Sequence, residues 1–290
     1  MTTTAELRSS LGRLGIWMPP MTALGLDPAR YGTAIEDAGL RSVWFPGINA
    51  PENLEPIATV LAATSRLIVG TGIASVWTWD PADLAARADD LARSYPGRFI
   101  LGLGNSHAPL VEATGQAYAR PYTKTVQFLD ALPPTQAPLV LAALGPKMLE
   151  LSRERTLGGH PYFVPPEHTA FARAALGPEP LLIPEIAVAL APGAEGEAHA
   201  RAYASLYLQL PNYTSNLKRF GFTDGDIADG GSERLITTVT PNGPEESAER
   251  IRQHLDAGAD HVLVQLLGEN GRFAPADLSK LASLVPDLLK

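Results

Sequence analysis

The sequence predicts a single (β/α)8 TIM barrel, in which eight parallel strands alternate with helices. Three observations support this fold class. Short apolar segments recur along the 290 residues, and most are followed by a segment with helical periodicity. Most of these apolar segments end in glycine or proline, as strands that run into loops do. The length suits a barrel that forms one domain, residues 1–290.

The composition argues against several functional classes. The net charge of -8 disfavours a nucleic-acid or anionic-membrane partner. The chain has no cysteine, which excludes disulfides, thiolate catalysis and cysteine metal sites. No apolar run reaches membrane-spanning length, and the first ten residues lack the apolar region of a signal peptide. We therefore expect a cytoplasmic protein whose partner is a small-molecule substrate.

The segment 67–107 shows the predicted repeating unit most clearly. Residues 67–73 are an apolar strand, and Asp80-Pro81 opens a helix with a capping residue followed by proline in the first turn. Residues 99–103 form the next strand. A strand, a helix and a strand predict a parallel pair with a right-handed crossover. Ligands bind at the carboxyl ends of such strands.

The other elements follow in chain order. We predict further strands at residues 14–18, 42–45, 139–144, 159–163, 182–190 and 262–267. We predict further helices at residues 27–39, 53–64, 121–132, 147–156, 166–176 and 275–289. Residues 1–12 are expected to form a frayed or helical leader, and residues 108–120 a longer loop.

The chain between the seventh and eighth strands is too long for one crossover helix. Residues 195–210 and 244–257 are predicted helices, and the piece between them, residues 211–232, is rich in turn-forming residues. We interpret residues 191–243, approximately, as a helical insertion. It either covers one side of the barrel mouth, forms a subunit interface, or has no direct role.

The fourth strand is followed by residues that are candidates for ligand binding and catalysis. Gly104 permits close backbone approach to a ligand, and His107, three residues further, is placed at the barrel mouth. A histidine there can exchange a proton with a substrate near neutral pH. The alternative is that His107 only caps the next turn. The pattern GLGNSH lacks the third glycine of a dinucleotide-binding motif.

Two other strand ends have room for a ligand. Gly72 and Ile73 end the third strand, where the glycine tolerates unusual backbone geometry or simply fits a tight corner. Residues 142–147 end the fifth strand in small residues and open a helix with Lys147, an arrangement that favours phosphate. A plain strand-to-helix turn explains the same residues equally well.

All four tryptophans lie on or just after the first three strands. They are Trp17, Trp44, Trp77 and Trp79. Tryptophan is usually a core residue, but these side chains also suit the wall of an aromatic substrate pocket.

The remaining histidines are weaker candidates. His160 lies in the sixth strand and is expected to face the mouth, whereas His168 and His199 lie on helices and are expected to be solvated. His261 enters the last strand from the opposite end, which indicates a structural role. No spacing matches a metal site, so no metal is predicted.

Several segments resemble the luciferase-like monooxygenase superfamily. The sequence VGTGI, followed by a helix and PGRFILGLGNSH, carries the resemblance, as does the later segment HLDAGADHVLVQLL. The chain is most similar to an actinobacterial branch of coenzyme F-420-dependent oxidoreductases. This resemblance implies a barrel that binds a reduced deazaflavin or flavin at the carboxyl ends of the strands.

The resemblance also implies which residues bind the cofactor. In the superfamily a non-prolyl cis peptide at the end of strand three lies behind the ring, and this position corresponds to Gly72–Ile73. The other implied contacts are Gly104, Asn105, His107, Ala142, Ala143, Gly145, Pro146, His160 and Tyr162. The superfamily commonly forms dimers, so we expect a homodimer.

Two departures from the superfamily bear on the substrate. Its sugar-phosphate dehydrogenases carry Asp-His after strand two and a glutamate after strand four, where this chain has residues 46–49 (PGIN) and His107. We therefore expect hydride transfer between coenzyme F-420 and a small apolar carbonyl, imine or activated alkene, with His107 as the catalytic residue. The alternatives are an FMN-dependent monooxygenase that uses oxygen, and a flavin- or deazaflavin-binding protein without turnover.

Overall fold

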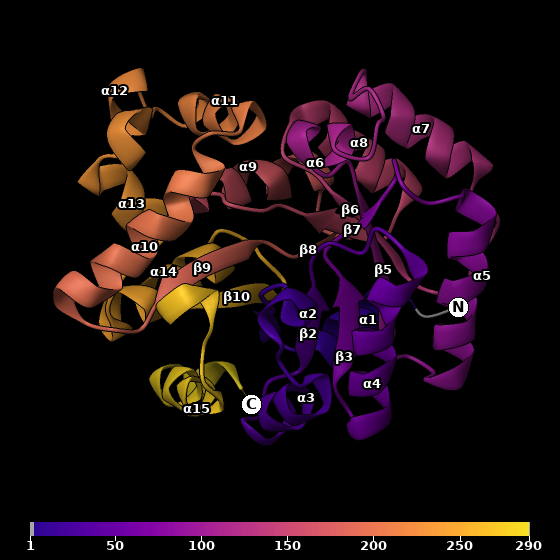
Figure 1. Ribbon diagram of the computed structural model, residues 1–290, viewed down its shortest axis with the longest axis horizontal. Coiled ribbons are helices and arrows are strands. Elements are labelled where there is room, and N and C mark those ends of the chain that lie inside the picture. The colour runs from indigo at the N-terminus through magenta and orange to yellow at the C-terminus, as the bar shows by residue number, and fades with distance from the viewer. Residues whose placement is uncertain (1–2, 290) are drawn as a thin grey trace.

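The protein is built around one curled sheet of parallel strands (Figure 1). The structure is a computed structural model, and it describes residues 3–289. The strands in this range are β1 (Leu14–Trp17), β2 (Ser42–Phe45), β3 (Ile68–Thr71), β4 (Ala74–Ser75), β5 (Phe99–Gly104), β6 (Leu139–Ala142), β7 (Gly158–His160), β8 (Leu181–Leu182), β9 (Glu185–Ala189) and β10 (Val262–Leu267). Their order is β8-β7-β6-β5-β3-β2-β1-β10-β9, and β4 pairs with β5.

The two ends of this strand order meet in one segment of chain. Only Ile183 and Pro184 separate β8 from β9. Ile183 N donates to Gly159 O at 2.9 Å on the β7 side, and Leu263 N donates to Pro184 O at 2.9 Å on the β10 side. Pro184 has no N–H, which interrupts the strand locally without separating its two halves. The sheet therefore curls round on itself, which agrees with the parallel α/β class that the sequence predicts, although within residues 3–289 it contains ten strands and not the predicted eight.

Helices connect the strands. They are α1 (Thr4–Leu11), α2 (Met21–Leu24), α3 (Pro28–Asp37), α4 (Glu55–Ala63), α5 (Pro81–Ser94), α6 (Ala108–Glu112), α7 (Pro121–Ala131), α8 (Pro146–Arg155), α9 (Pro166–Leu176), α10 (Gly193–Tyr207), α11 (Pro211–Arg219), α12 (Asp224–Ile227), α13 (Glu233–Val239), α14 (Pro244–Asp256) and α15 (Pro275–Leu284). The 3₁₀ turns are η1 (Pro51–Leu54), η2 (Ala228–Gly230), η3 (Glu269–Gly271) and η4 (Pro286–Leu288).

Asp-Pro pairs begin helices as the sequence predicts. Asp80 Oδ1 accepts from Ala82 N at 2.9 Å and from Asp83 N at 3.0 Å, and Pro81 is the first residue of α5. The first-turn N–H groups have no partner within the helix, so this carboxylate satisfies two of them.

Two segments expected to be irregular contain helices. Residues 108–120, predicted as a loop, begin with α6, and residues 211–232, predicted as turns, contain α11, α12 and η2. In α11 the buried residues are Tyr213, Asn216 and Leu217, which lie three and four positions apart on one face. Burial of this face stabilises a helix in a segment whose local composition favours turns. Helices α10–α14 lie together to one side of the sheet in Figure 1.

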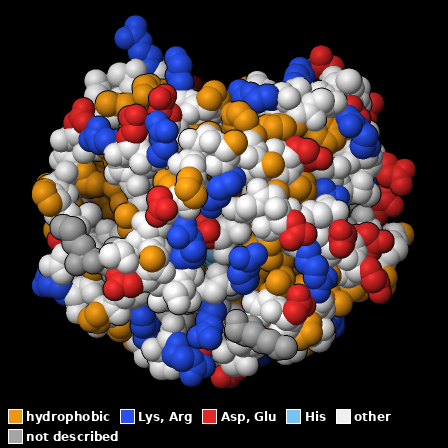
Figure 2. All heavy atoms as spheres, turned by 180° about the vertical axis from the view of Figure 1, so that it is seen from behind, with side chains coloured by type: hydrophobic (Ala, Val, Ile, Leu, Met, Phe, Trp, Pro, Cys, Tyr) orange, Lys and Arg blue, Asp and Glu red, His pale blue; other side chains and the backbone are white. Residues whose placement is uncertain are grey.

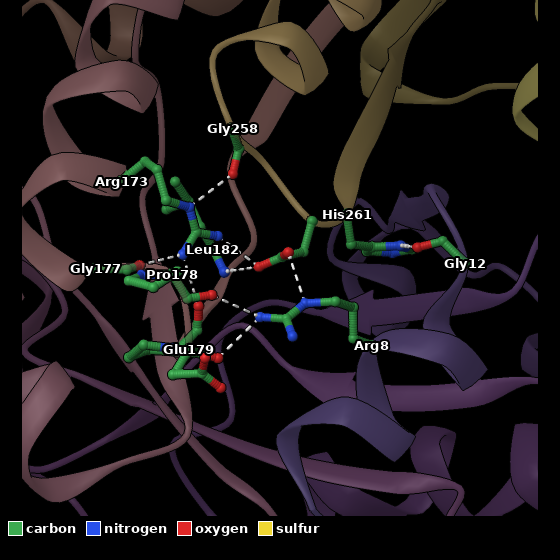
Figure 3. A network of polar contacts seen from close by, with 11 residues as sticks. Arg8, Gly12, Arg173, Gly177, Pro178, Glu179, Leu182, Gly258 and His261 are labelled. Carbon is green, nitrogen blue, oxygen red and sulfur yellow. Dashed lines mark hydrogen bonds and ion pairs between the residues drawn. The ribbon is translucent and has the colours of Figure 1, made fainter.

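The amino-terminal ends of the strands are joined by a polar network (Figure 3). Asp260 accepts from Arg8 Nε at 2.8 Å, from Arg173 Nη2 at 2.6 Å and from Leu182 N at 2.8 Å. The buried His261 contacts Ser42 Oγ at 2.7 Å and Gly12 O at 3.1 Å. This agrees with the structural role that the sequence predicts for His261.

The expectation for His168 is wrong. The side chain is fully buried, and its Nε2 lies 2.9 Å from Leu144 O. The face of α9 that carries His168 packs inward, so the histidine satisfies a strand-end carbonyl and is not solvated.

Surface charges of both signs are interspersed on the face shown in Figure 2, with apolar side chains exposed between them. Within residues 3–289 no helix combines the length and the apolarity needed to cross a bilayer.

Candidate functional site

The cavity at the carboxyl ends of the strands has a volume of about 460 Å³. Ten of the residues selected from the sequence line it. They are Trp17, Gly72, Ile73, Asn105, His107, Ala142, Ala143, Gly145, His160 and Tyr162. The ends of β1, β3, β5, β6 and β7 thus contribute to one cavity, because parallel strands finish at the same edge of the sheet.

The other selected residues lie outside this lining. Gly104 is buried beneath it, where an added Cβ would lie 2.8 Å from Ile73 Cγ1 and 2.9 Å from Ala142 Cβ. The small size of Gly104 therefore serves packing between strand ends, not the approach of a ligand. Pro146 and Lys147 are exposed at the start of α8, outside the lining.

Three of the four tryptophans are also outside the lining. Trp44 is fully buried inside the curled sheet, and Trp79 donates from Nε1 to Ile48 O at 2.8 Å in the core. Trp77 packs behind Tyr118, with ring centroids 5.2 Å apart, and Tyr118 lines the cavity. Only Trp17 forms part of the wall, so the predicted four-tryptophan pocket is wrong.

The base of the cavity is formed at the end of β3. The Gly72–Ile73 peptide bond is cis, which confirms the expectation drawn from the resemblance. An added Cβ on Gly72 would lie 2.2 Å from Cη2 and Cζ3 of Trp17. Glycine is required here because the ring of Trp17 lies directly against the backbone.

His107 lies at the mouth without a structural partner. It is the N-cap residue of α6, but its side chain makes no capping hydrogen bond. Its Nδ1 is buried without a partner, and its ring centroid is 5.4 Å from that of Tyr213. Burial lowers the pKa of His107, so its imidazole is neutral at neutral pH. The capping alternative is therefore not supported.

Asn105 presents an acceptor next to His107. Its Nδ2 donates to Thr125 Oγ1 at 2.8 Å, and its Oδ1 is buried without a partner. Thr125 lies on α7 and is itself buried. The hydrogen bond to Thr125 fixes the amide and leaves one oxygen able to accept from a ligand.

His160 is held as a neutral imidazole with one free nitrogen. Its Nδ1 is 2.6 Å from Ile183 O, and because a carbonyl only accepts, Nδ1 carries the hydrogen. Nε2 is then an acceptor, and it has no partner. The ring stacks on Trp17 with centroids 5.1 Å apart, and burial lowers its pKa to about 4.

Helices α10 and α11 supply residues that sequence reasoning missed. Tyr207 on α10, and Asn212 and Tyr213 on α11, line the same cavity as His107 and Met148. Tyr203 and Tyr207 lie four residues apart on a predicted helix, so an aromatic pair on one helical face was the available signal. Residues of this segment therefore line one side of the cavity, which is compatible with the covering role considered for it.

The tyrosines form a buried hydrogen-bonded group around an acidic residue. Tyr162 Oη lies 2.8 Å from both Tyr203 Oη and Tyr207 Oη, and it donates to Gln265 Oε1 at 3.1 Å. Tyr203 Oη lies 3.4 Å from Glu185 Oε1. Glu185 is fully buried, and burial raises its pKa to about 8.

A second cavity of about 370 Å³ adjoins the first. Trp17, Pro46, Gly47, Tyr162 and Tyr207 line both cavities, so the two share a wall. The remaining lining of the second cavity is mainly apolar and includes Met18, Met21, Phe45 and Ile48, with Asn53 and Gln265 as polar members.

No group of acidic residues and histidines within residues 3–289 has the arrangement of a metal site. The polar atoms of the main cavity are instead spaced around an apolar aromatic interior. This arrangement suits a flat organic ring with a few hydrogen-bonding positions.

Comparison with known sequences identifies relatives for part of the chain. Residues 27–133 match the luciferase-like monooxygenase family. The chain is 28% identical over 155 residues to the 5,10-methylenetetrahydromethanopterin reductase of Methanolobus tindarius, covering 44% of this chain and 48% of that protein. It is 31% identical over 121 residues to a Mycobacterium tuberculosis protein whose name gives it as a coenzyme F420-dependent oxidoreductase, covering 41% and 33%. The matches thus span half or less of these relatives.

Solved structures share the fold over almost the whole chain. An F420-dependent secondary alcohol dehydrogenase in complex with an F420-acetone adduct has a TM-score of 0.73 at 16% identity, covering 96% of this chain and 99% of that one. The FMN complex of the oxygenating constituent of 3,6-diketocamphane monooxygenase from Pseudomonas putida has a TM-score of 0.70 at 15% identity, with coverage of 96% and 99%. Residues 27–133 thus resemble the luciferase-like monooxygenase family, and nearly the whole chain shares its fold with these solved structures.

Proposed function

We propose that this protein is an oxidoreductase that transfers a hydride between coenzyme F-420 and a small organic substrate. The observation that carries the proposal is the cavity itself. Gly72 and Ile73 form its base, an aromatic wall encloses it, and the buried acceptors of Asn105 and His160 have no protein partner. The name of one aligned relative refers to coenzyme F420, and a solved structure with the same fold is an F420-dependent secondary alcohol dehydrogenase; both favour the deazaflavin.

The residues present fit a deazaflavin or flavin ring. Such a ring carries an N–H group that needs an acceptor, and Asn105 Oδ1 and His160 Nε2 are both free to accept. The small residues Ala142, Ala143 and Gly145 line the cavity, and there is open space at Gly145, where an added Cβ would meet no atom within 4 Å. Contacts from Pro146 and Lys147 to a phosphate stay predictions. When bound, the coenzyme supplies the hydride.

His107 is the proposed group that acts on the substrate. Since burial keeps its imidazole neutral, an N–H of the ring can polarise a carbonyl or imine without being an imidazolium ion. The apolar lining excludes water from the reacting atoms, and it favours a small apolar carbonyl, imine or activated alkene over a sugar phosphate.

The second candidate is a monooxygenase that uses reduced FMN and oxygen. The FMN-bound monooxygenase with the same fold supports this alternative. A third candidate, a flavin- or deazaflavin-binding protein without turnover, would use the same cavity. We further propose a homodimer, to which the exposed Leu206 on α10 could contribute. Light scattering that gives the mass of a monomer at micromolar concentration would contradict the dimer.

Titration of the purified protein with each cofactor tests the proposal. We expect oxidised coenzyme F-420 to bind at least tenfold more tightly than FMN, measured by the change in coenzyme fluorescence. Reduced F-420 should then be reoxidised by one member of a panel of small ketones, imines and activated alkenes without oxygen uptake. Tighter binding of FMN with oxygen consumption would favour the monooxygenase. Tight binding without any reoxidation would favour the binding protein.

A further inference from the structure

We propose that Glu185 is the proton reservoir of this site and delivers a proton to the cavity through the hydroxyl groups of Tyr203 and Tyr162. The inference rests on the proposed function, because reduction of a carbonyl or imine consumes one proton for each hydride. It assigns proton transfer to three residues that were not selected from the sequence as catalytic.

Glu185 is buried without a basic side chain within residues 3–289 to neutralise it. It is the first residue of β9 and is fully buried. Its contacts are Phe163 N at 3.4 Å, donating to Oε2, and Tyr203 Oη at 3.4 Å. Within residues 3–289 it forms no ion pair with lysine, arginine or histidine. Burying an unpaired carboxylate is costly, so the carboxyl group is kept as a neutral acid.

Two tyrosine hydroxyl groups connect this acid to the cavity. Tyr203 Oη on α10 is 3.4 Å from Glu185 Oε1 and 2.8 Å from Tyr162 Oη. Tyr162 lines both cavities. Each hydroxyl can donate and accept at once, which a proton relay requires.

The other groups around this path carry no charge that would hold the proton elsewhere. Tyr207 Oη lies 2.8 Å from Tyr162 Oη, and Gln265 Oε1 on β10 accepts from Tyr162 at 3.1 Å. Tyr213 on α11 is the remaining titratable neighbour. Burial raises the pKa of all four tyrosines above the ordinary value, so none is ionised near neutral pH.

The proton balance is simple for a ketone. In the relay, the hydroxyl of Tyr162 turns from Gln265 Oε1 toward the substrate. As the carbonyl carbon gains a hydride, its oxygen takes the proton of Tyr162. Tyr162 takes the proton of Tyr203, and Tyr203 takes the proton of Glu185. The shift is concerted, since no tyrosinate is stable in this surrounding. Glu185 ends as a carboxylate and regains a proton from solvent after the alcohol leaves. Oxidation of an alcohol runs the same steps in reverse.

Glu185 is also better matched to this task than the two histidines of the cavity. His107 and His160 both have lowered pKa values and are neutral, so neither holds a readily released proton at neutral pH. The pKa of Glu185, raised to about 8, keeps its proton available there.

Infrared spectroscopy of the protein without coenzyme gives the first test. Wild type should show the carbonyl stretch of a protonated carboxylic acid at pH 7, and the band should disappear as the pH rises through about 8. Glu185→Gln should lack the band. Tyr203→Phe should shift it, whereas Tyr31→Phe, which removes a buried hydroxyl bonded to Phe273 O, should leave it unchanged. An absent band, or one unaffected by Tyr203→Phe, would overturn the relay.

Turnover gives the second test, with reduced coenzyme F-420 and cyclohexanone as the probe. Wild type should show a rate that falls above about pH 8 and a solvent deuterium isotope effect. Glu185→Gln should be slower by roughly 10²-fold, lose both signatures and keep its affinity for F-420. A variant that retains the wild-type pH profile would refute the relay while leaving the proposed function intact. Failure of wild type to bind F-420, or to turn over the ketone, would remove the relay in this form even if the infrared band is present.

Discussion

The indole ring of Trp17 lies so close to Gly72 that an added Cβ would come within 2.2 Å of two ring atoms. Gly72→Ala should therefore overpack the base of the cavity and cost about 1–3 kcal/mol of unfolding free energy. Trp17→Phe removes the ring atoms that would clash. The double variant should therefore lose less unfolding free energy than the sum of the losses in the two single variants. Urea unfolding measures all three. Gly145→Ala is the control, since its Cβ meets no atom within 4 Å. Additive effects would show that the contact is not the cause.

Gly145 offers a way to block the cavity without disturbing the fold. Its backbone has φ -92°, which any residue adopts, and a side chain there would enter open space in the lining. Gly145→Leu should lower F-420 or FMN affinity at least tenfold, with little change in melting temperature. The matched control, Gly225→Leu on α12, lies outside the lining and should leave binding unchanged. Unchanged binding in Gly145→Leu would mean that the cofactor occupies another place.

His107→Ala separates catalysis from structure. Because the His107 side chain makes no capping hydrogen bond, the substitution should leave the melting temperature nearly unchanged. Turnover should fall roughly 10²–10⁴-fold while coenzyme affinity changes little. His199→Ala, on α10 and outside the lining, is the control. Near-normal turnover in His107→Ala would remove this residue from the mechanism and direct attention to His160.

Buried histidines should make the fold sensitive to acid. Burial lowers the pKa of His160, His168 and His261 to about 4, and that of His254 to about 3. Between pH 6.5 and these values the unfolded chain binds protons that the folded chain does not, so stability falls as pH falls. Each histidine contributes at most about 1.4 kcal/mol per pH unit. Urea midpoints at pH 7, 6 and 5 should decline progressively, and a flat profile would contradict the burial.

Glu185 should make the fold less stable as pH rises, whereas the buried histidines make it less stable as pH falls. Its pKa is raised from 4.5 to about 8, so the folded chain holds a proton that the unfolded chain releases. Its contribution to stability is complete below pH 4.5 and is lost as pH rises toward 8. Glu185→Gln should therefore gain stability relative to wild type as pH rises over this interval. An unchanged difference between the two proteins from pH 5 to pH 8 would show that the carboxyl group is ionised throughout.

The Asp260 network should contribute to global stability. Asp260→Asn weakens the contacts to both Arg8 and Arg173 and should cost about 1–3 kcal/mol, measured by urea unfolding. The control is Asp83→Asn, which removes an exposed pair with Arg87 on one helix and should cost less than about 0.5 kcal/mol. Equal losses in the two variants would mean that the network in Figure 3 adds nothing beyond a surface ion pair.

Local sequence was sufficient for most of the elements and for part of the site. The Asp80-Pro81 pair predicts the start of α5, because helix capping depends on residues next to the helix end. The apolar run 99–103 predicts β5, because a buried parallel strand is apolar along its length. Gly72 and His107 follow strand ends and His160 is the last residue of β7, and parallel strands end at one edge of the sheet. Their membership of one cavity could thus be predicted once the strands were recognised.

The side of each strand and the path of the helices between β9 and β10 depended on tertiary packing. Trp17 and Trp44 occupy similar places in the sequence, yet one lines the cavity and the other is enclosed by the sheet. Tyr162 forms hydrogen bonds with Tyr203, which is 41 residues away in the sequence, and with Gln265, which is 103 residues away. No local pattern encodes such contacts, because burial of the inner faces of α10 and α11 brings these residues together. That same burial removes Glu185 from water and raises its pKa.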